Sequence, residues 1–128
     1  MKPMTREWVA KAEGDFDVVL LLLKSRKRNR FDPVCFHAQQ CVETYLKGRL
    51  VEAQLPYSKT HDLELLLNLA IAVEPLWAVF ALEFRSLTEW AVLPRYPGKD
   101  ADLAKSRIAV KTCRRFRDVA RLALGLKP

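Results

Sequence analysis

The fold is most easily recognised from residues 100–124, which read DADLAKSRIAVKTCRRFRDVARLAL. Apolar and cationic side chains recur there with helical spacing, so they fall on opposite sides of one helix. The apolar side consists of Ile108, Ala109, Thr112, Cys113, Phe116, Val119, Ala120 and Ala123. The cationic side consists of Arg107, Lys111, Arg114, Arg115, Arg117 and Arg121. A helix divided in this way needs neighbouring elements that cover its apolar side, which indicates a helical bundle.

Two helices are predicted in the N-terminal half by the same periodicity. The first has Thr5 as its cap and is followed by a basic connector, residues 24–30. The second runs from Pro33 to about Gln54, with Asp32 as its N-cap and the proline at its first position. The apolar stripe of the first helix consists of Trp8, Ala12, Phe16, Val19 and Leu23.

Two more helices precede the last one. The third begins near His61 and Asp62, and the fourth begins at Pro75. Trp77 and Trp90 lie off the main apolar stripe of the fourth helix, so they are candidates either for a dimer interface or for the core. A loop is expected over residues 93–99, which contain two prolines and a glycine. The main apolar stripe of the fourth helix consists of Leu76, Phe80, Phe84, Leu87 and Ala91.

Length and composition limit the class of protein. We expect an all-α fold, an antiparallel up-and-down bundle of four to five helices, forming a single domain over residues 1–128. The longest apolar run, residues 18–23, is far shorter than the roughly 20 residues that span a bilayer. No secretory signal is visible, and Cys35, Cys41 and Cys113 lack the spacing of a zinc site or a disulfide framework. We therefore expect a cytoplasmic protein with buried thiols, no metal, no cofactor and no membrane contact.

The positive charge is concentrated in one segment. Residues 103–128 contain eight basic residues and one acid, so they account for the whole net charge of +7. The cationic side of the last helix could bind RNA, DNA or an acidic protein partner. It could equally be a solvated surface that keeps the protein soluble.

A polar stripe on the second helix is unusual for a core helix. His37, Gln40, Glu43 (or Thr44) and Lys47 are three or four residues apart and therefore share a face. This face offers an acid, a base and an amide, which suits a binding site. The alternative is an ordinary exposed face with a Glu43–Lys47 ion pair.

The segment Phe36–Gly48 resembles the A-Q-Q-x-x-E-K-x-L-K-A signature of HEPN (higher eukaryotes and prokaryotes nucleotide-binding) domains. Two further pieces agree with that family in order and spacing: His61-Asp62-Leu63 and Arg95-Tyr96-Pro97. Thr44 is a departure, because the family pattern often has lysine there. The resemblance extends to the first helix through Trp8, Ala12 and Asp15.

The resemblance implies a compact helical bundle that is usually a symmetric dimer. Many small members are encoded beside a minimal nucleotidyltransferase and act as its partner, in pairs of the toxin–antitoxin kind. Other members are metal-independent ribonuclease toxins with an R-x(4–6)-H motif near the last helices.

A ribonuclease of this kind needs the arginine and the histidine of the R-x(4–6)-H motif near the C-terminal helices. The sequence contains only His37 and His61, so neither Arg85 nor Arg95 is followed by a histidine. Arg30 and His37 have the R-x6-H spacing but lie at the start of the second helix. We therefore assign no catalytic residues and expect a non-catalytic protein.

The resemblance and the polar stripe together suggest a nucleotide site. Arg95 or Lys47 could hold phosphate, Tyr96 could stack on the base, and Gln40 and Glu43 could bind the ribose or a base edge. The same residues could instead tie the bundle or its dimer interface together through buried hydrogen bonds. The candidate ligand-binding residues are His37, Gln40, Glu43, Lys47, His61, Arg95 and Tyr96.

Overall fold

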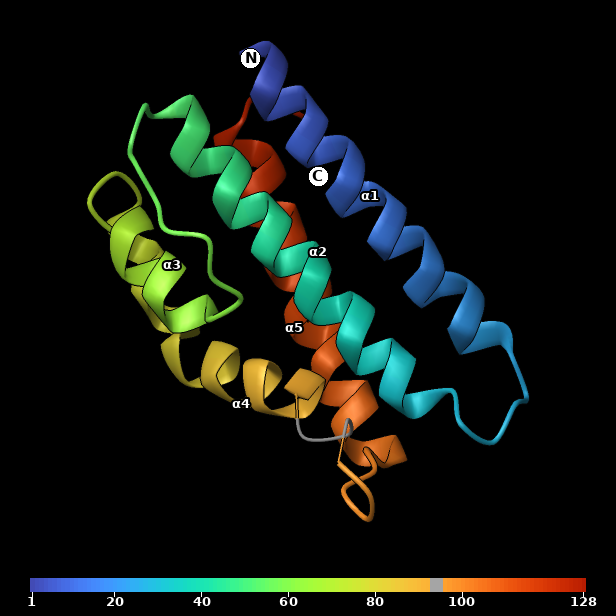
Figure 1. Ribbon diagram of the computed structural model, residues 1–128. Helices are drawn as coiled ribbons and strands as arrows, with labels where there is room; N and C mark the ends of the chain where they lie inside the picture. The colour runs from blue at the N-terminus through green and yellow to red at the C-terminus, as the bar shows by residue number, and fades with distance from the viewer. Residues whose placement is uncertain (93–95) are drawn as a thin grey trace.

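A computed structural model describes residues 1–92 and 96–128, and all regular structure within them is helical, as expected. The α1 and α2 helices lie side by side in antiparallel orientation, α5 lies along α2, and α3 and α4 cover the remaining side (Figure 1). None of the described helices is both long and apolar enough to span a bilayer. The elements are α1 (Pro3–Lys24), α2 (Phe31–Glu52), α3 (Leu63–Ala70), the 3-10 helix η1 (Pro75–Phe80), α4 (Ala81–Val92) and α5 (Leu103–Ala123).

The α1 helix begins earlier than predicted, and Thr5 is not its cap. Helical residues start at Pro3, where a missing N–H costs nothing, so Thr5 lies inside the helix. Its buried hydroxyl donates to Glu52 Oε1 at 2.8 Å, which ties the start of α1 to the end of α2. Leu23 was placed in the apolar stripe, but it is 44% exposed, and Leu22 packs against the core in the last turn instead.

The α2 helix is the central element and contacts α1, α3, α4 and α5. It starts at Phe31, so Asp32 is not its N-cap but belongs to its first turn. The Asp32 carboxylate instead accepts the Ala101 N–H at 2.6 Å, which attaches the segment before α5 to the start of α2. Every residue from Cys41 to Gly48 is buried, although Glu43 and Lys47 are charged.

The predicted fourth helix divides into two elements of different geometry. Residues Pro75–Phe80 form η1, whose turn of three residues points Trp77 and Phe80 inward and leaves Leu76 exposed. The prediction that Leu76 joins the core is therefore wrong. Trp77 packs edge-on against Phe116 of α5, with ring centroids 4.9 Å apart, so it fills the core and not an interface. Trp90 is half-buried against the same core.

The last helix starts and ends near the predicted positions. Asp102 caps α5, its carboxylate accepting the Lys105 N–H at 2.8 Å. Ile108 was assigned to the buried side, yet it is half-exposed, whereas Val110, which was not assigned to that side, is buried. The three cysteines are buried thiols, and burial raises the pKa of Cys35 to about 12.

A carboxylate clamp joins α1, α2 and α5. Glu13 of α1 accepts two hydrogen bonds from the Arg117 guanidinium, at 2.6 and 2.8 Å, and one from the Tyr45 hydroxyl. Arg121 donates to the Tyr45 oxygen at 3.2 Å. Burial raises the pKa of Glu13, but the hydrogen bonds from Arg117 and Tyr45 outweigh it, so the net pKa is lowered.

We expect Glu13→Gln to lower the free energy of unfolding at neutral pH by about 1–2 kcal/mol, because a charged hydrogen-bonded acceptor is lost. The folded-state pKa of Glu13 lies below its usual value of 4.5. Its contribution is therefore complete above pH 4.5 and disappears as the pH falls through the folded-state pKa. Urea unfolding across this pH range should show that the free energies of unfolding of the wild type and of Glu13→Gln converge in acid. Glu7→Gln, an exposed acid of the same helix, is the control and should change little.

Two glycines allow a test of the contact between α1 and α2. An added Cβ at Gly14 meets nothing within 4 Å, whereas at Gly48 it would lie 3.2 Å from Trp8 Cβ. We expect Gly14→Ala to stabilise the protein by about 0.5–1 kcal/mol through helix propensity. Gly48→Val should destabilise it by about 1–3 kcal/mol through overpacking. Thermal unfolding measures the stability changes of both variants. Equal effects of the two substitutions would contradict the close approach of α1 to α2 at Gly48.

Candidate functional site

The polar stripe of α2 is built around one buried carboxylate. The Glu43 side chain is 4% exposed and sits among three donors. Lys47 Nζ lies 3.0 Å from Oε2, and His61 Nδ1 lies 2.8 Å from Oε1. Gln39 Nε2 donates to the same Oε1 at 3.3 Å. The stripe is therefore not an ordinary exposed face at Glu43 and Lys47.

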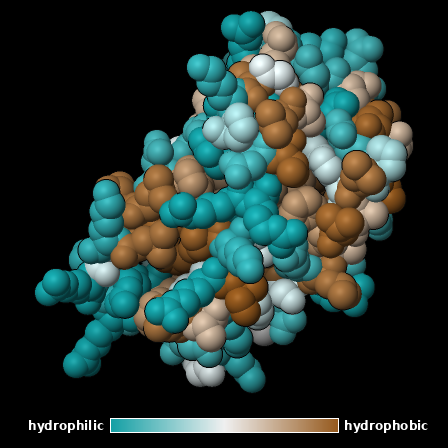
Figure 2. All heavy atoms as spheres, turned by 180° about the vertical axis from the view of Figure 1, so that it is seen from behind, coloured by the Kyte–Doolittle hydropathy of each residue, from teal (hydrophilic) through white to brown (hydrophobic). Residues whose placement is uncertain are grey.

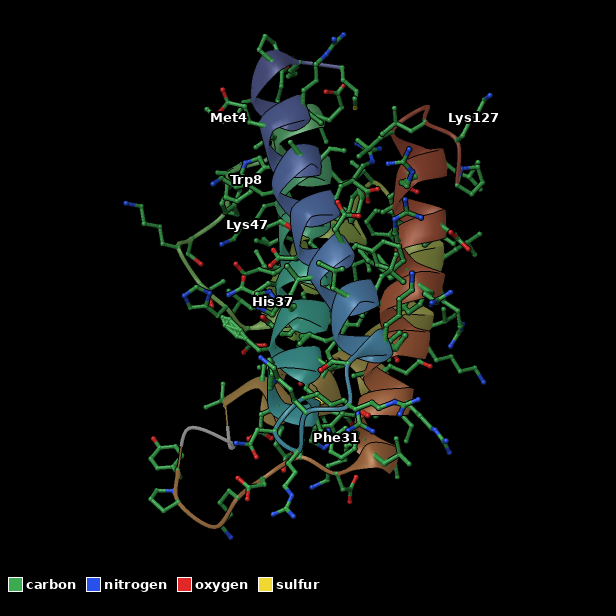
Figure 3. All side chains as sticks on the ribbon, turned by 90° about the vertical axis from the view of Figure 1, so that its right-hand side faces the viewer. Met4, Trp8, Phe31, His37, Lys47 and Lys127 are labelled. Atoms are coloured by element: carbon green, nitrogen blue, oxygen red, sulfur yellow. The ribbon has the colours of Figure 1, made fainter. Side chains whose placement is uncertain are left out.

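Two aromatic rings surround the Lys47 ammonium group. Its Nζ lies 5.4 Å from the Trp8 ring centroid and 5.9 Å from that of Tyr57. These two rings contact each other edge-on, and in Figure 3 Trp8 and Lys47 lie beside one another along α1 and α2. The cation is thus held by a carboxylate and by the π-faces of two rings, which offset part of its desolvation cost. The Trp8 Nε1 is buried and has no hydrogen-bond partner among the described residues.

The His61 ring is the exposed end of this arrangement. Its side chain is 76% exposed, although Glu43 holds its Nδ1. Gln39 also donates to the His61 carbonyl oxygen at 2.9 Å, which fixes the backbone just before α3. His61 borders a hollow of about 60 Å³ that is also lined by Phe36, Gln39, Gln40, Ala91 and Val92.

The structure brings together only some of the predicted site residues. Glu43, Lys47 and His61 form one hydrogen-bonded group, and Gln40 lines the adjacent hollow. His37 has a different partner, because its Nδ1 lies 2.8 Å from Asp15 Oδ1 on α1. Thr44, considered as an alternative to Glu43, donates to the Gln40 carbonyl oxygen and so turns away from this group.

Two further residues were predicted to belong to the site but are not seen in it, and one residue of the site was not predicted. Arg95 lies outside the described residues. Tyr96 is 61% exposed and is not among the described residues that line the hollow. Gln39, which bonds to both Glu43 and His61, was not predicted from the sequence. Its position four residues before Glu43 was the available signal, because that spacing places both side chains on one face.

The cationic side of α5 is less exposed than predicted. Arg117 and Arg121 face α1 and the Glu13 clamp, with side-chain exposures of 19% and 18%. Arg115 is exposed but pairs with Glu83 of α4. Because these three arginines are paired, the exposed cations that remain on this side of the described helix are Arg107, Lys111 and Arg114. The Arg114 guanidinium lies 5.9 Å from the Phe16 ring centroid.

The residues that matched the ribonuclease spacing do not form a joint site. The Arg30 guanidinium lies 4.5 Å from the Phe31 ring centroid and donates to the Lys27 carbonyl oxygen. His37 is bonded to Asp15. Each side chain therefore has a separate partner.

We expect Glu43→Ala to lower the free energy of unfolding by about 3–5 kcal/mol, because Lys47 remains buried without its counter-charge. The double variant Glu43→Leu with Lys47→Met removes both charges and should recover most of the loss. Urea unfolding is the measurement, with Glu64→Ala as a control that breaks an exposed pair with Arg85 and should have little effect. A double variant as unstable as Glu43→Ala would contradict the pairing argument.

Comparison with known proteins identifies one family. The HEPN domain model matches residues 5–123, which is nearly the whole chain. Searches of curated proteins and of solved structures gave no significant match. Two of the segments that carried the resemblance, Phe36–Gly48 and His61–Leu63, contain the buried polar group and the cap of α3. The helical bundle and the family match agree, and the chain belongs to the HEPN domain family.

Proposed function

We propose that this chain is a non-catalytic HEPN protein of the cytoplasm, a single domain that acts as a dimeric nucleotide-binding or interaction module. Its proposed partner is a minimal nucleotidyltransferase, in a pair of the toxin–antitoxin kind. The observation that carries the binding role is the buried Glu43, which orients an exposed imidazole beside a hollow lined by carboxamides. The proposed partner is based on the family alone.

The roles of the site residues follow from their partners. Lys47 is already neutralised by Glu43, so it is not the phosphate contact. Glu43 occupies Nδ1 of His61, so Nε2 remains for a hydrogen bond to a ligand. Gln40 lines the same hollow and can both donate to and accept from a base edge.

The size of the hollow sets the strength of binding. Its volume of about 60 Å³ is well below the roughly 300–1,000 Å³ of ordinary ligand pockets. It therefore holds one edge or one phosphate group of a nucleotide and leaves the rest in solvent. Binding is accordingly weak, and recognition of a nucleotide attached to a partner protein is easier than capture of a free one.

We expect ATP to bind the wild-type protein with millimolar affinity, measured by calorimetry and by chemical-shift changes at His61 and Gln40. His61→Ala should weaken binding roughly tenfold and Gln40→Ala several-fold, because each removes a hydrogen bond to the ligand. Asn68→Ala is the matched control, since it removes an exposed amide elsewhere on the surface. The proposal fails if millimolar nucleotide produces neither heat nor shift changes.

The alternative is an atypical ribonuclease, and one assay separates the two. The separate partners of Arg30 and His37 support the non-catalytic function. Incubation of the purified protein with RNA should leave the RNA intact. Cleavage by the wild type that is abolished in His37→Ala would instead establish the ribonuclease.

A further inference from the structure

The most exposed large apolar side chains among the described residues form one ridge. They are Leu76, Val79 and Leu82, with exposures of 84%, 71% and 73%. In Figure 2, apolar side chains line the right-hand side of the molecule, where η1 and the start of α4 lie. We call these three residues the η1 ridge.

Helix geometry aligns the ridge. In a 3-10 helix, side chains three residues apart lie directly above one another. Leu76 and Val79 are therefore eclipsed along η1, and Leu82 follows at the first turn of α4. Trp77 and Phe80 point to the opposite side and pack on Phe116, which holds η1 in this unusually long 3-10 form. The outward apolar residues are thus fixed in place by the core.

The surroundings of the η1 ridge are electrically neutral. Between Ile71 and Leu82 the only charged residue is Glu74, which is paired with Arg49 at 2.9 Å. The bordering acids are paired as well, Glu64 with Arg85 and Glu83 with Arg115. No net charge therefore opposes the approach of a second apolar surface.

We propose that the η1 ridge is the contact between two copies of this chain, related by a two-fold axis. A symmetric interface must be able to face itself, so an uncharged patch is suitable and a cationic patch is not. This condition excludes the exposed side of α5 as the symmetric contact. It also disfavours the apolar group around Leu21, because the basic segment 24–30 follows it directly and would add like charge to both sides of a symmetric contact. The η1 ridge contains the three most exposed large apolar side chains of the described residues, and it meets the condition.

The simplest arrangement places two ridges side by side and antiparallel. Val79 is the middle residue, so it lies next to the axis and faces Val79 of the partner subunit. This proposal names the surface for the dimeric state in the proposed function, but it does not depend on the nucleotide site.

Light scattering during gel filtration tests the interface. Over a micromolar concentration series, the wild type should have twice the monomer mass of 14.7 kDa. Leu82→Glu should shift the mass to that of the monomer. Leu21→Glu, an equally exposed leucine on α1, should remain dimeric. A monomeric wild type, or dissociation caused by Leu21→Glu and not by Leu82→Glu, would overturn the proposal.

A charge-reversal pair tests the two-fold arrangement. Val79→Glu and Val79→Lys should each be monomeric, since like charges meet at the axis, and an equimolar mixture should form the dimer again. A mixture that stays monomeric would overturn the antiparallel ridge contact. Circular dichroism confirms that each variant is folded, and ATP titration of Leu82→Glu reports on the nucleotide site separately. A Leu82→Glu variant that stays dimeric would overturn the ridge contact, whereas absence of ATP binding to the wild type would contradict the nucleotide site alone.

Discussion

The α2 helix places charged side chains in the middle of the bundle, and the rest of the structure accommodates them. A carboxylate or ammonium group loses its hydration on burial, and this cost is offset only by close partners. Glu43 therefore uses both oxygens, with Lys47 on one and His61 and Gln39 on the other. The requirement reaches beyond α2, because His61 belongs to the segment before α3.

A second carboxylate follows the same logic on another face of α2. Glu13 draws Arg117 and Arg121 inward and orders the Tyr45 hydroxyl, so three helices are fixed by one acid. Burial and the bond to Glu13 raise the pKa of Tyr45, which keeps the phenol protonated as the donor. The arginines used in this way are withdrawn from the surface. Fewer cations of α5 therefore face solvent than the sequence suggests.

The outer surface separates two kinds of contact. Exposed cations lie on α5 and on the connector after α1, whereas the neutral apolar ridge lies on η1 and α4. The hollow beside His61 opens between α2 and the end of α4, apart from the ridge residues. A dimer formed through the ridge would therefore leave the hollow available to a ligand or to a partner protein. The buried polar group both stabilises the bundle and orients the imidazole, so the structural and binding interpretations of the stripe are not exclusive.

The helices and the family could be predicted from the sequence, because apolar periodicity and the spacing of short polar motifs are local properties. The caps show the limit of that information. Asp62 and Asp102 cap the helices that they precede, whereas Thr5 and Asp32, equally good caps by type, bond to Glu52 and Ala101 far along the chain. The site shows the same limit. The sequence placed Glu43 and Lys47 on one face, but it could not show that His61 joins them, that His37 pairs with Asp15, or that Gln39 contributes. The inward turn of Arg117 and the 3-10 form of η1 were likewise decided only in the folded bundle. Spacing fixes which side chains share a helix face, but the partners of a buried charge come from distant segments that meet only when the helices pack.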